Sequence, residues 1–123
     1  MKNNPVGWFE IYVQDMARAR AFYESVLEGK LERLPSPEVE MWSFPMQPTA
    51  SGAGGALVKM QGFASGGNST LVYFVCDDCA VEEARVQRSG GRVERPKMSI
   101  GEYGFISLVV DTEGNMIGLH SMK

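Results

Sequence analysis

The sequence lacks the features that mark membrane proteins and nucleic-acid-binding proteins. No apolar run approaches the roughly 20 residues that cross a bilayer, and the first residues, MKNNPVGW, contain no apolar stretch of the signal-peptide kind. The net charge of −3 gives no positive surface for nucleic acid or for an anionic membrane. We therefore expect a cytoplasmic protein with no nucleic-acid partner and no membrane partner.

Cysteine and histidine are also scarce, with two Cys and one His. Cys76 and Cys79 form a C-x-x-C pattern at a predicted strand-to-helix junction, which is where redox motifs occur. However, Cys76 alternates with Val72 and Phe74, which favours a small buried hydrophobe, and the two Asp residues between the cysteines disfavour a thiolate. We interpret the pair as core and cap residues, and redox or metal chemistry is the alternative.

What the sequence does contain is one pattern written twice. Residues 9–30 read FEIYVQDMARARAFYESVLEGK, and residues 72–93 read VYFVCDDCAVEEARVQRSGGRV. In each copy an alternating apolar run ends at an Asp, an Ala-rich helical pattern follows, and Gly ends that pattern. A period near half the chain is too long for a solenoid, so we expect two paired modules with a cavity between them.

Glycine and proline breakers and the apolar alternation predict the element order βαβββ in each half. The first half has a predicted helix at 16–27 and strands at 6–13, 30–34, 39–44 and 55–60. The second half has a predicted helix at 79–89 and strands at 70–76, 91–95, 105–110 and 115–120, with Pro96 ending the strand at 91–95 and a hairpin turn at 111–114. We expect one domain over 1–123, divided into module 1 at 1–61, a flexible connector at 62–68 and module 2 at 69–123.

Two segments carry a resemblance to a known family, FEIYVQDMARARAFYESVL near the start and YGFISLVVDTEGNMIGLHS near the end. At this spacing the chain resembles the vicinal oxygen chelate (VOC) superfamily, which includes glyoxalase I, extradiol dioxygenases and bleomycin-resistance proteins. The resemblance covers essentially the whole chain. It implies an α+β fold in which two paired βαβββ modules form a curved eight-stranded mixed sheet. Helices would cover the convex side, and the concave side, or cup, would hold a small-molecule ligand.

The resemblance also implies a metal site built from four strand positions that typically carry His or Glu. In this sequence those positions fall on Trp8, Val58, Leu71 and Gly118. None of these side chains can coordinate a divalent cation. With a single His, the 2-His-1-carboxylate arrangement cannot be built from one chain. We therefore predict neither a metal nor another cofactor at the site that the family uses.

Strand alternation predicts that a second ring of side chains faces the cup, two residues beyond the metal positions. This ring is polar at Glu10 and His120 and apolar or aromatic elsewhere. An apolar hollow with a few polar groups is typical of small-molecule sites. The ligand-binding residues that we predict are Trp8, Tyr12, Trp42, Met60, Tyr73 and Tyr103.

Glu10 and His120 are the candidate catalytic residues. Glu10 stands in a strand whose other face is Phe-Ile-Val, so packing does not explain it, and it fits a general base or an anchor for a cationic or hydroxylated ligand. The alternative is a carboxylate that is paired with Lys59 or His120, or exposed at the rim. His120 fits an acid/base partner, and the alternative is a solvent-facing residue on a terminal strand.

Three functions fit these observations. The first is a metal-free small-molecule binding protein of the glyoxalase/bleomycin-resistance type, with an apolar or aromatic ligand in the cup and Glu10 as polar anchor. The second is a glyoxalase-related lyase or isomerase, or a dioxygenase-like enzyme, which uses Glu10 and His120 as unusual metal ligands or as a metal-free acid/base pair. The third is an interaction module whose cavity is filled by its own side chains. We expect a homodimer, because family members are often dimers and each module has exposed sheet edges.

Overall fold

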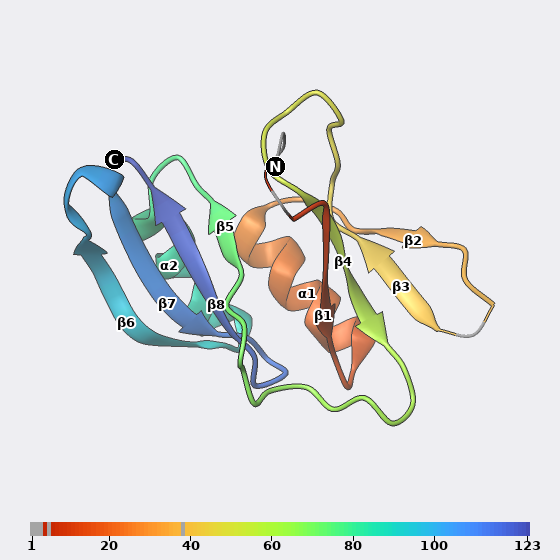
Figure 1. The fold of residues 1–123 in the computed structure, drawn as a ribbon. Coiled ribbons are helices and arrows are strands. Elements are labelled where there is room, and N and C mark those ends of the chain that lie inside the picture. The colour runs from red at the N-terminus through yellow and green to blue at the C-terminus, as the bar shows by residue number, and fades with distance from the viewer. Residues whose placement is uncertain (1–3, 5, 38) are drawn as a thin grey trace.

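The computed structural model describes residues 4, 6–37 and 39–123. The chain folds as an α+β protein of two βαβββ modules, which confirms the predicted fold class (Figure 1). Module 1 consists of β1 (Trp8–Tyr12), α1 (Met16–Leu27), β2 (Glu32–Leu34), β3 (Glu40–Ser43) and β4 (Gly54–Lys59). Module 2 consists of β5 (Tyr73–Val75), α2 (Cys79–Val86), β6 (Arg92–Ser99), β7 (Phe105–Val110) and β8 (Met116–Ser121), with short 3₁₀ turns η1 (Gln87–Ser89) and η2 (Gly101–Tyr103).

Each module forms one four-stranded mixed sheet, ordered β1-β4-β3-β2 in module 1 and β5-β8-β7-β6 in module 2. The pairs β1/β4 and β5/β8 are parallel, and the other neighbours are antiparallel. Where the sheets approach each other, side chains join them: Phe9 and Phe74 make an edge-to-face contact with ring centroids 5.9 Å apart. In the described part of the chain the single eight-stranded sheet expected from the family is therefore two sheets of four strands.

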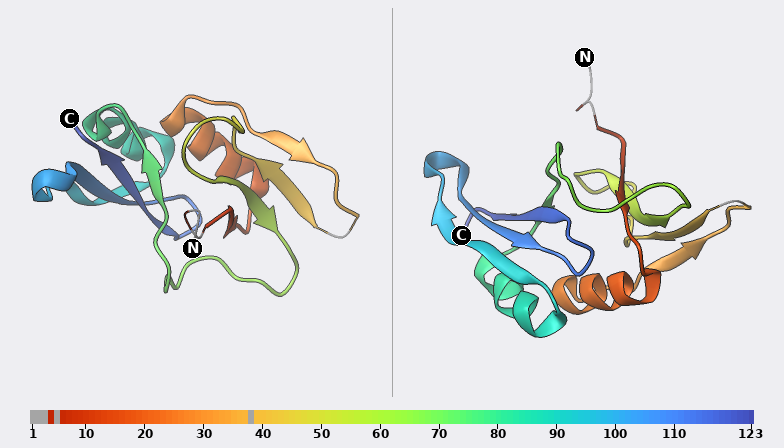
Figure 2. Two further views of the ribbon diagram at one scale, coloured as in Figure 1. Left: turned by 45° about the horizontal axis from the view of Figure 1, so that its top comes forward. Right: turned by 90° about the horizontal axis from the view of Figure 1, so that it is seen from below.

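The two helices lie side by side on one side of the molecule, and both sheets lie on the other (Figure 2). Each helix starts as the sequence predicts. The carboxylate of Asp15 accepts a hydrogen bond from the backbone N–H of Arg18, and that of Asp78 accepts one from Ala80, each at 3.0 Å. Within the described ranges, neither helix has the length and apolar character needed to cross a membrane.

The alternation of β1 decides which side chains reach the core and which reach the cup. Ile11 is buried toward the helices, whereas Trp8 and Glu10 are exposed on the opposite face. Aromatic rings fill the core beneath the junction of the modules, where Phe44 and Phe74 stand 5.3 Å apart. The two faces of β1 therefore divide as the sequence predicts, with the core on one side and the cup on the other.

The largest error in a predicted strand boundary is at β6. The prediction that Pro96 ends the strand at 91–95 fails, since β6 continues to Ser99. β6 is an edge strand, and its register with β7 shifts between Arg95 and Met98. A proline at an irregular position of an edge strand removes no central ladder hydrogen bond, so the strand passes through it.

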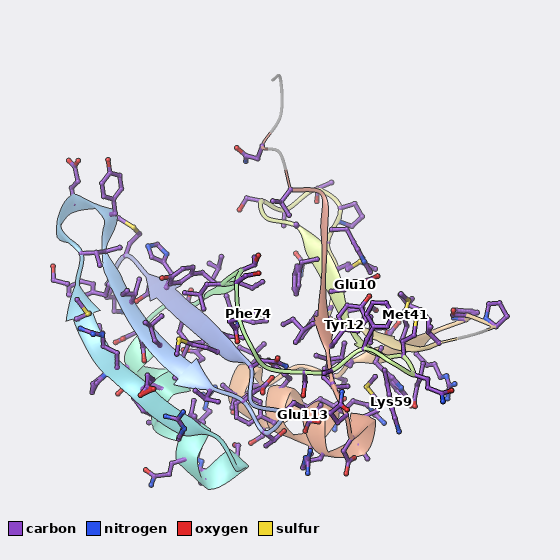
Figure 3. The ribbon with its side chains drawn as sticks, turned by 60° about the horizontal axis from the view of Figure 1, so that its bottom comes forward. Glu10, Tyr12, Met41, Lys59, Phe74 and Glu113 are labelled. Carbon is purple, nitrogen blue, oxygen red and sulfur yellow. The ribbon has the colours of Figure 1, made fainter. Side chains whose placement is uncertain are left out.

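The turn between β7 and β8 ties module 2 to module 1 (Figure 3). The Glu113 carboxylate accepts hydrogen bonds from the backbone N–H groups of Gln14 and Asp15 at 2.8 and 2.9 Å. It also pairs with Arg18, whose Nε lies 2.7 Å from Oε2. Burial alone would raise the pKa of Glu113, but the Arg18 guanidinium and the backbone donors outweigh it and hold the pKa at about 2. The ionised carboxylate therefore fixes the start of α1 against the hairpin.

A buried network behind this contact reaches the wall of the cup. The Tyr23 hydroxyl donates to Asp111 at 2.6 Å, and burial followed by the Asp111 charge raises the pKa of Tyr23 well above its ordinary value. Asn115 donates to Asp111 at 3.2 Å and to the carbonyl of Tyr12 at 3.0 Å. Its Oδ1 accepts from the backbone N–H of Gly66 at 2.7 Å. The hairpin thus holds β1 and the segment between the modules at a fixed separation.

Candidate functional site

The cup, as the name is used from here on, consists of the sheet faces that point away from the helices (Figure 2). In module 1, Glu10 and Tyr12 of β1 stand beside Ala56 and Val58 of β4. In module 2, Tyr73 and Val75 of β5 stand beside Gly118 and His120 of β8. Among the apolar members, Trp8, Tyr73 and Val75 are 40%, 45% and 84% exposed, whereas Ala56 and Val58 are buried. Several large apolar side chains exposed on one face are typical of a binding surface.

The strand register corrects one of the four metal positions. Glu10 and Tyr73 are equivalent, because each lies five residues before the Asp that caps its helix. Glu10 pairs with Ala56, and Tyr73 pairs with Gly118. The counterpart of Gly118 is therefore Ala56 and not Val58. For the same reason the counterpart of His120 is Val58 and not Met60, which lies beyond the end of β4.

The corrected set offers no better ligands for a metal. Trp8, Ala56, Leu71 and Gly118 carry no oxygen, sulfur or imidazole nitrogen with which to bind a divalent cation. At Gly118 the space is also taken, because a Cβ added there would collide with the ring of Tyr73. In the described ranges no three His, Cys, Asp or Glu side chains gather as a metal site would require. The residues present therefore do not fit the metal that the family implies.

Glu10 lies between two aromatic side chains of its own strand. Its carboxylate accepts a hydrogen bond from Trp8 Nε1 at 3.2 Å and another from the Tyr12 hydroxyl at 3.0 Å. Burial and the adjacent Glu10 raise the pKa of Tyr12, so this hydroxyl keeps its proton at neutral pH. Across the described part of the chain, no ion pair includes Glu10, and the pairing with Lys59 or His120 considered above is not formed.

His120 lies on the cup face of β8, and its imidazole forms a hydrogen bond with the turn η2. Its Nε2 lies 2.7 Å from the backbone carbonyl of Tyr103 in η2. Since a carbonyl oxygen only accepts, this nitrogen carries the proton. Within the residues that the structure describes, no hydrogen bond joins His120 to Glu10. The two candidate catalytic residues are therefore not brought together as an acid/base pair.

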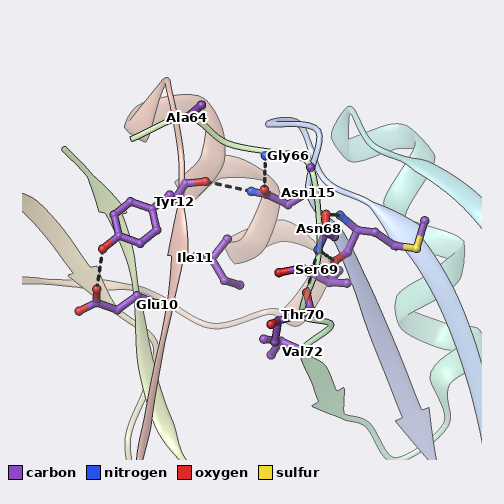
Figure 4. A pocket seen from close by; sticks show the side chains of 13 residues that line it. Glu10, Ile11, Tyr12, Ala64, Gly66, Asn68, Ser69, Thr70, Val72 and Asn115 are labelled. Atoms are coloured by element: carbon purple, nitrogen blue, oxygen red, sulfur yellow. Dashed lines mark hydrogen bonds between the residues drawn. The ribbon is translucent and has the colours of Figure 1, made fainter. Parts of the chain in front are cut away.

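A cavity of about 240 Å³ opens beside β1, and the connector and the residues that follow it form the facing wall (Figure 4). Glu10 and Tyr12 line one side, and Ser69, Thr70 and Val72 line the other. A second cavity, of about 710 Å³, lies beyond the connector, and Met60 lines it together with Lys59, Glu40 and Phe63. Phe63, which lines this second cavity, stacks on Tyr12, which lines the first, with ring centroids 5.3 Å apart.

Trp42 does not face the cup, and this prediction is corrected. It pairs with Leu57, which is fully buried on the helix side of β4. Its indole N–H donates to Glu40 at 3.1 Å, and the guanidinium of Arg20 from α1 stacks on its ring at 3.4 Å. The side chain of Trp42 therefore lies on the helix side of β3, whereas the prediction required it on the cup side.

The structure adds side chains that the sequence analysis missed. Met41 precedes Trp42 and pairs with Val58, so it takes the place on the cup side that was expected for Trp42; Figure 3 shows it close to Glu10 and Tyr12. Val75 was passed over although it has the same parity as Tyr73, which was a usable signal. Tyr103, which was predicted to bind ligand, is 68% exposed at the end of η2.

The two cysteines behave as core residues. Both are buried and free, and burial followed by the nearby Glu82 raises the pKa of Cys76 to about 12. The backbone N–H of Cys79 donates to the hydroxyl of Ser121 at 2.9 Å. The prediction of a buried hydrophobe at Cys76 is therefore confirmed, and its thiol is protonated at neutral pH.

Comparison with solved structures places the fold among known proteins. Glyoxalase I from Zea mays is 19% identical with a TM-score of 0.74; the match covers 96% of this chain but 46% of the maize chain, so the chain spans about half the length of that protein. A glyoxylase/bleomycin resistance protein/dioxygenase domain from Frankia sp. EAN1pec is 14% identical with a TM-score of 0.74, and 99% of this chain and 100% of that chain are covered. TnmS3, an antibiotic binding protein from Streptomyces sp. CB03234, is 26% identical with a TM-score of 0.69, and 98% of each chain is covered.

Comparison with the sequences of curated proteins gives no match. Comparison with protein-family models agrees with the structural result. The family model described as the Glyoxalase/Bleomycin resistance protein/Dioxygenase superfamily matches residues 6–119, which is nearly the whole sequence. With the duplicated βαβββ plan and the matched length, the chain belongs to the glyoxalase/bleomycin resistance protein/dioxygenase superfamily.

Proposed function

We propose that this protein is a metal-free small-molecule binding protein that holds an apolar or aromatic ligand in the cup. The observation that carries the proposal is the chemistry of the concave face. The four family metal positions carry Trp8, Ala56, Leu71 and Gly118, while exposed aromatic and aliphatic groups stand around them. A ligand that covers these groups removes apolar surface from water, at about 25 cal/mol for each Å².

Glu10 serves in this proposal as the polar anchor of the ligand. Its carboxylate is exposed on the cup and already oriented by hydrogen bonds from Trp8 and Tyr12. A few fixed polar groups in an apolar hollow supply orientation and specificity. The similarity to TnmS3, an antibiotic binding protein that is 26% identical over 98% of both chains, supports binding as the role of the cup.

The alternative functions have less support. An enzyme of the glyoxalase type that used Glu10 and His120 would need the two residues near one substrate atom, but the His120 Nε2 is engaged by the carbonyl of Tyr103. An interaction module with a self-filled cavity would need its aromatic residues packed inside, but Trp8 and Tyr73 are 40% and 45% exposed. We therefore rank binding above catalysis and above a purely structural role.

We further propose that the protein acts as a homodimer in the cytoplasm, built as one domain with the module limits given above. The free thiols of Cys76 and Cys79 are compatible with a reducing compartment. The short edge strands β2 and β5 offer backbone groups to a second copy. Sedimentation equilibrium would decide the oligomeric state, since a mass of one chain at micromolar concentration would refute the dimer.

The ligand-binding role is tested by titration with a neutral aromatic probe, 2-(2-naphthyl)ethanol, after treatment with a chelator. We expect binding that Val75→Ala weakens and that Val81→Ala leaves unchanged. Both valines are exposed, at 84% and 48%, but Val75 lies in the cup and Val81 on helix α2. Equal effects of the two substitutions, or binding that appears only after a divalent metal is added, would contradict the proposal.

A further inference from the structure

Glu10 carries a charge that the fold does not use. Its side chain is exposed on the cup, and the hydrogen bonds that it accepts come from the neutral groups of Trp8 and Tyr12. An ionised carboxylate has about four acceptor sites, so about half of them stay available. Among the described residues none of the cations that form ion pairs is paired with Glu10. Within the described residues the carboxylate of Glu10 therefore has no ion-pair partner.

The surroundings of this charge also favour a cation. Trp8 and Tyr12 flank Glu10 on the same face of β1, and the Phe63 ring stacks on Tyr12 at 5.3 Å with 22° between the planes. The faces of aromatic rings attract cations, and they do so most strongly when water is displaced. Lys59 is the one cation of β1 and β4, and it shares the helix-side parity of Leu57. Arg95 has cup-side parity, because it pairs with Leu108 and Leu108 pairs with Gly118, but it belongs to β6, the outer edge strand of module 2.

The Tyr12 side chain supplies a further acceptor oxygen beside Glu10. Since the Tyr12 hydroxyl donates its proton to Glu10, its oxygen still has lone pairs to offer. A carboxylate and a phenol oxygen side by side match a group that carries several N–H donors.

We propose that the cup recognises a protonated aromatic amine. The ammonium group donates hydrogen bonds to Glu10 and to the Tyr12 oxygen, and the aromatic body lies against the exposed ring of Trp8 on the same face of β1. This proposal rests on the proposed function, because it names the class of ligand that the same surface accepts.

The test uses three probes with one aromatic body and different charges. These are 2-(2-naphthyl)ethylamine, 2-(2-naphthyl)ethanol and 2-naphthylacetate, titrated calorimetrically and by the NMR signal of the Trp8 indole N–H, which donates to Glu10. We expect the amine to bind roughly tenfold more tightly than the alcohol, as one charge-assisted hydrogen bond provides, and the acetate to bind most weakly. Glu10→Gln should abolish the advantage of the amine over the alcohol.

Glu40→Gln is the matched control. Glu40 accepts a hydrogen bond from Trp42 Nε1 at 3.1 Å, which repeats the Trp–Glu arrangement of β1 on the helix side of β3. This variant should keep the preference for the amine. Equal binding of all three probes, with no effect of Glu10→Gln, would overturn this inference and leave the proposed function intact. Absence of binding by all three would overturn both, and a preference that Glu40→Gln also abolishes would overturn the assignment to Glu10.

Discussion

Replacing Glu113 by Gln tests the contact that joins the two modules and so sets the geometry of the cup. The carboxylate accepts hydrogen bonds from the backbone of Gln14 and Asp15 and from Arg18, and its side chain has no exposed surface. Glutamine has the same size but carries no charge, and its amide nitrogen would face donors. The substitution therefore removes the ion pair and leaves part of the site unsatisfied.

The expected loss follows from the pKa of Glu113. A folded-state pKa of about 2, against an ordinary value of 4.5, corresponds to about 3 kcal/mol of stability at neutral pH. Because the Arg18 side chain is 51% exposed, solvent screening reduces the expectation to about 2 kcal/mol. The pKa is depressed on folding, so this stability is fully present above about pH 4.5 and is lost as the pH falls toward 2.

Urea unfolding of the wild type, of Glu113→Gln and of a control, Glu102→Gln in the exposed turn η2, measures this effect. At neutral pH only Glu113→Gln should lose about 2 kcal/mol, and its difference from the wild type should shrink steadily below about pH 4.5. A difference that is the same at neutral and acidic pH would show that packing, and not the charge, carries the contribution. Unchanged stability at neutral pH would refute the reasoning altogether.

Two further predictions concern the loss of the family's metal site and the state of the cysteines. Gly118→Ala should lower the free energy of unfolding in urea by about 1–3 kcal/mol, because the added Cβ collides with the Tyr73 ring. The Tm of Gly118→Glu should not rise when Zn²⁺ or Ni²⁺ is added, and a rise in Tm with metal would contradict this account. The thiols of Cys76 and Cys79 should react with dithionitrobenzoate only after unfolding, since burial raises the pKa of Cys76 to about 12, and rapid labelling of the folded protein would show that the pair is accessible.

Much of the fold could be predicted because its signals are local. The alternation around Glu10 assigned the faces of β1, and the N-cap residues Asp15 and Asp78 marked the starts of both helices. These features depend on neighbouring residues in one segment. The turn at 111–114 was predicted for the same reason, because an Asp and a Gly stand where the chain reverses.

The errors arose where the register or the face of a strand depends on its pairing with another strand. In the sequence, Gly54 and Gly55 resemble Gly114 and Asn115, which precede the last strand. In the structure both glycines belong to β4, so the residue that corresponds to Gly118 is Ala56, two residues before the predicted Val58. The face of Trp42 is set by antiparallel pairing with Leu57, which no local pattern reveals. The role of Glu113 was missed for a similar reason, since its partners lie almost a hundred residues away in the sequence.

The central claim is that the cup binds a small aromatic ligand without a metal, and one NMR titration tests it most directly. The protein is freed of metals with a chelator and titrated with 2-(2-naphthyl)ethylamine while the signals of every residue are followed. The account predicts saturable shifts that gather on the cup at Trp8, Glu10, Tyr73 and Val75 and spare the helix side at Trp42 and Val81. Shifts that gather on the helix side, or that need an added divalent metal, would contradict it.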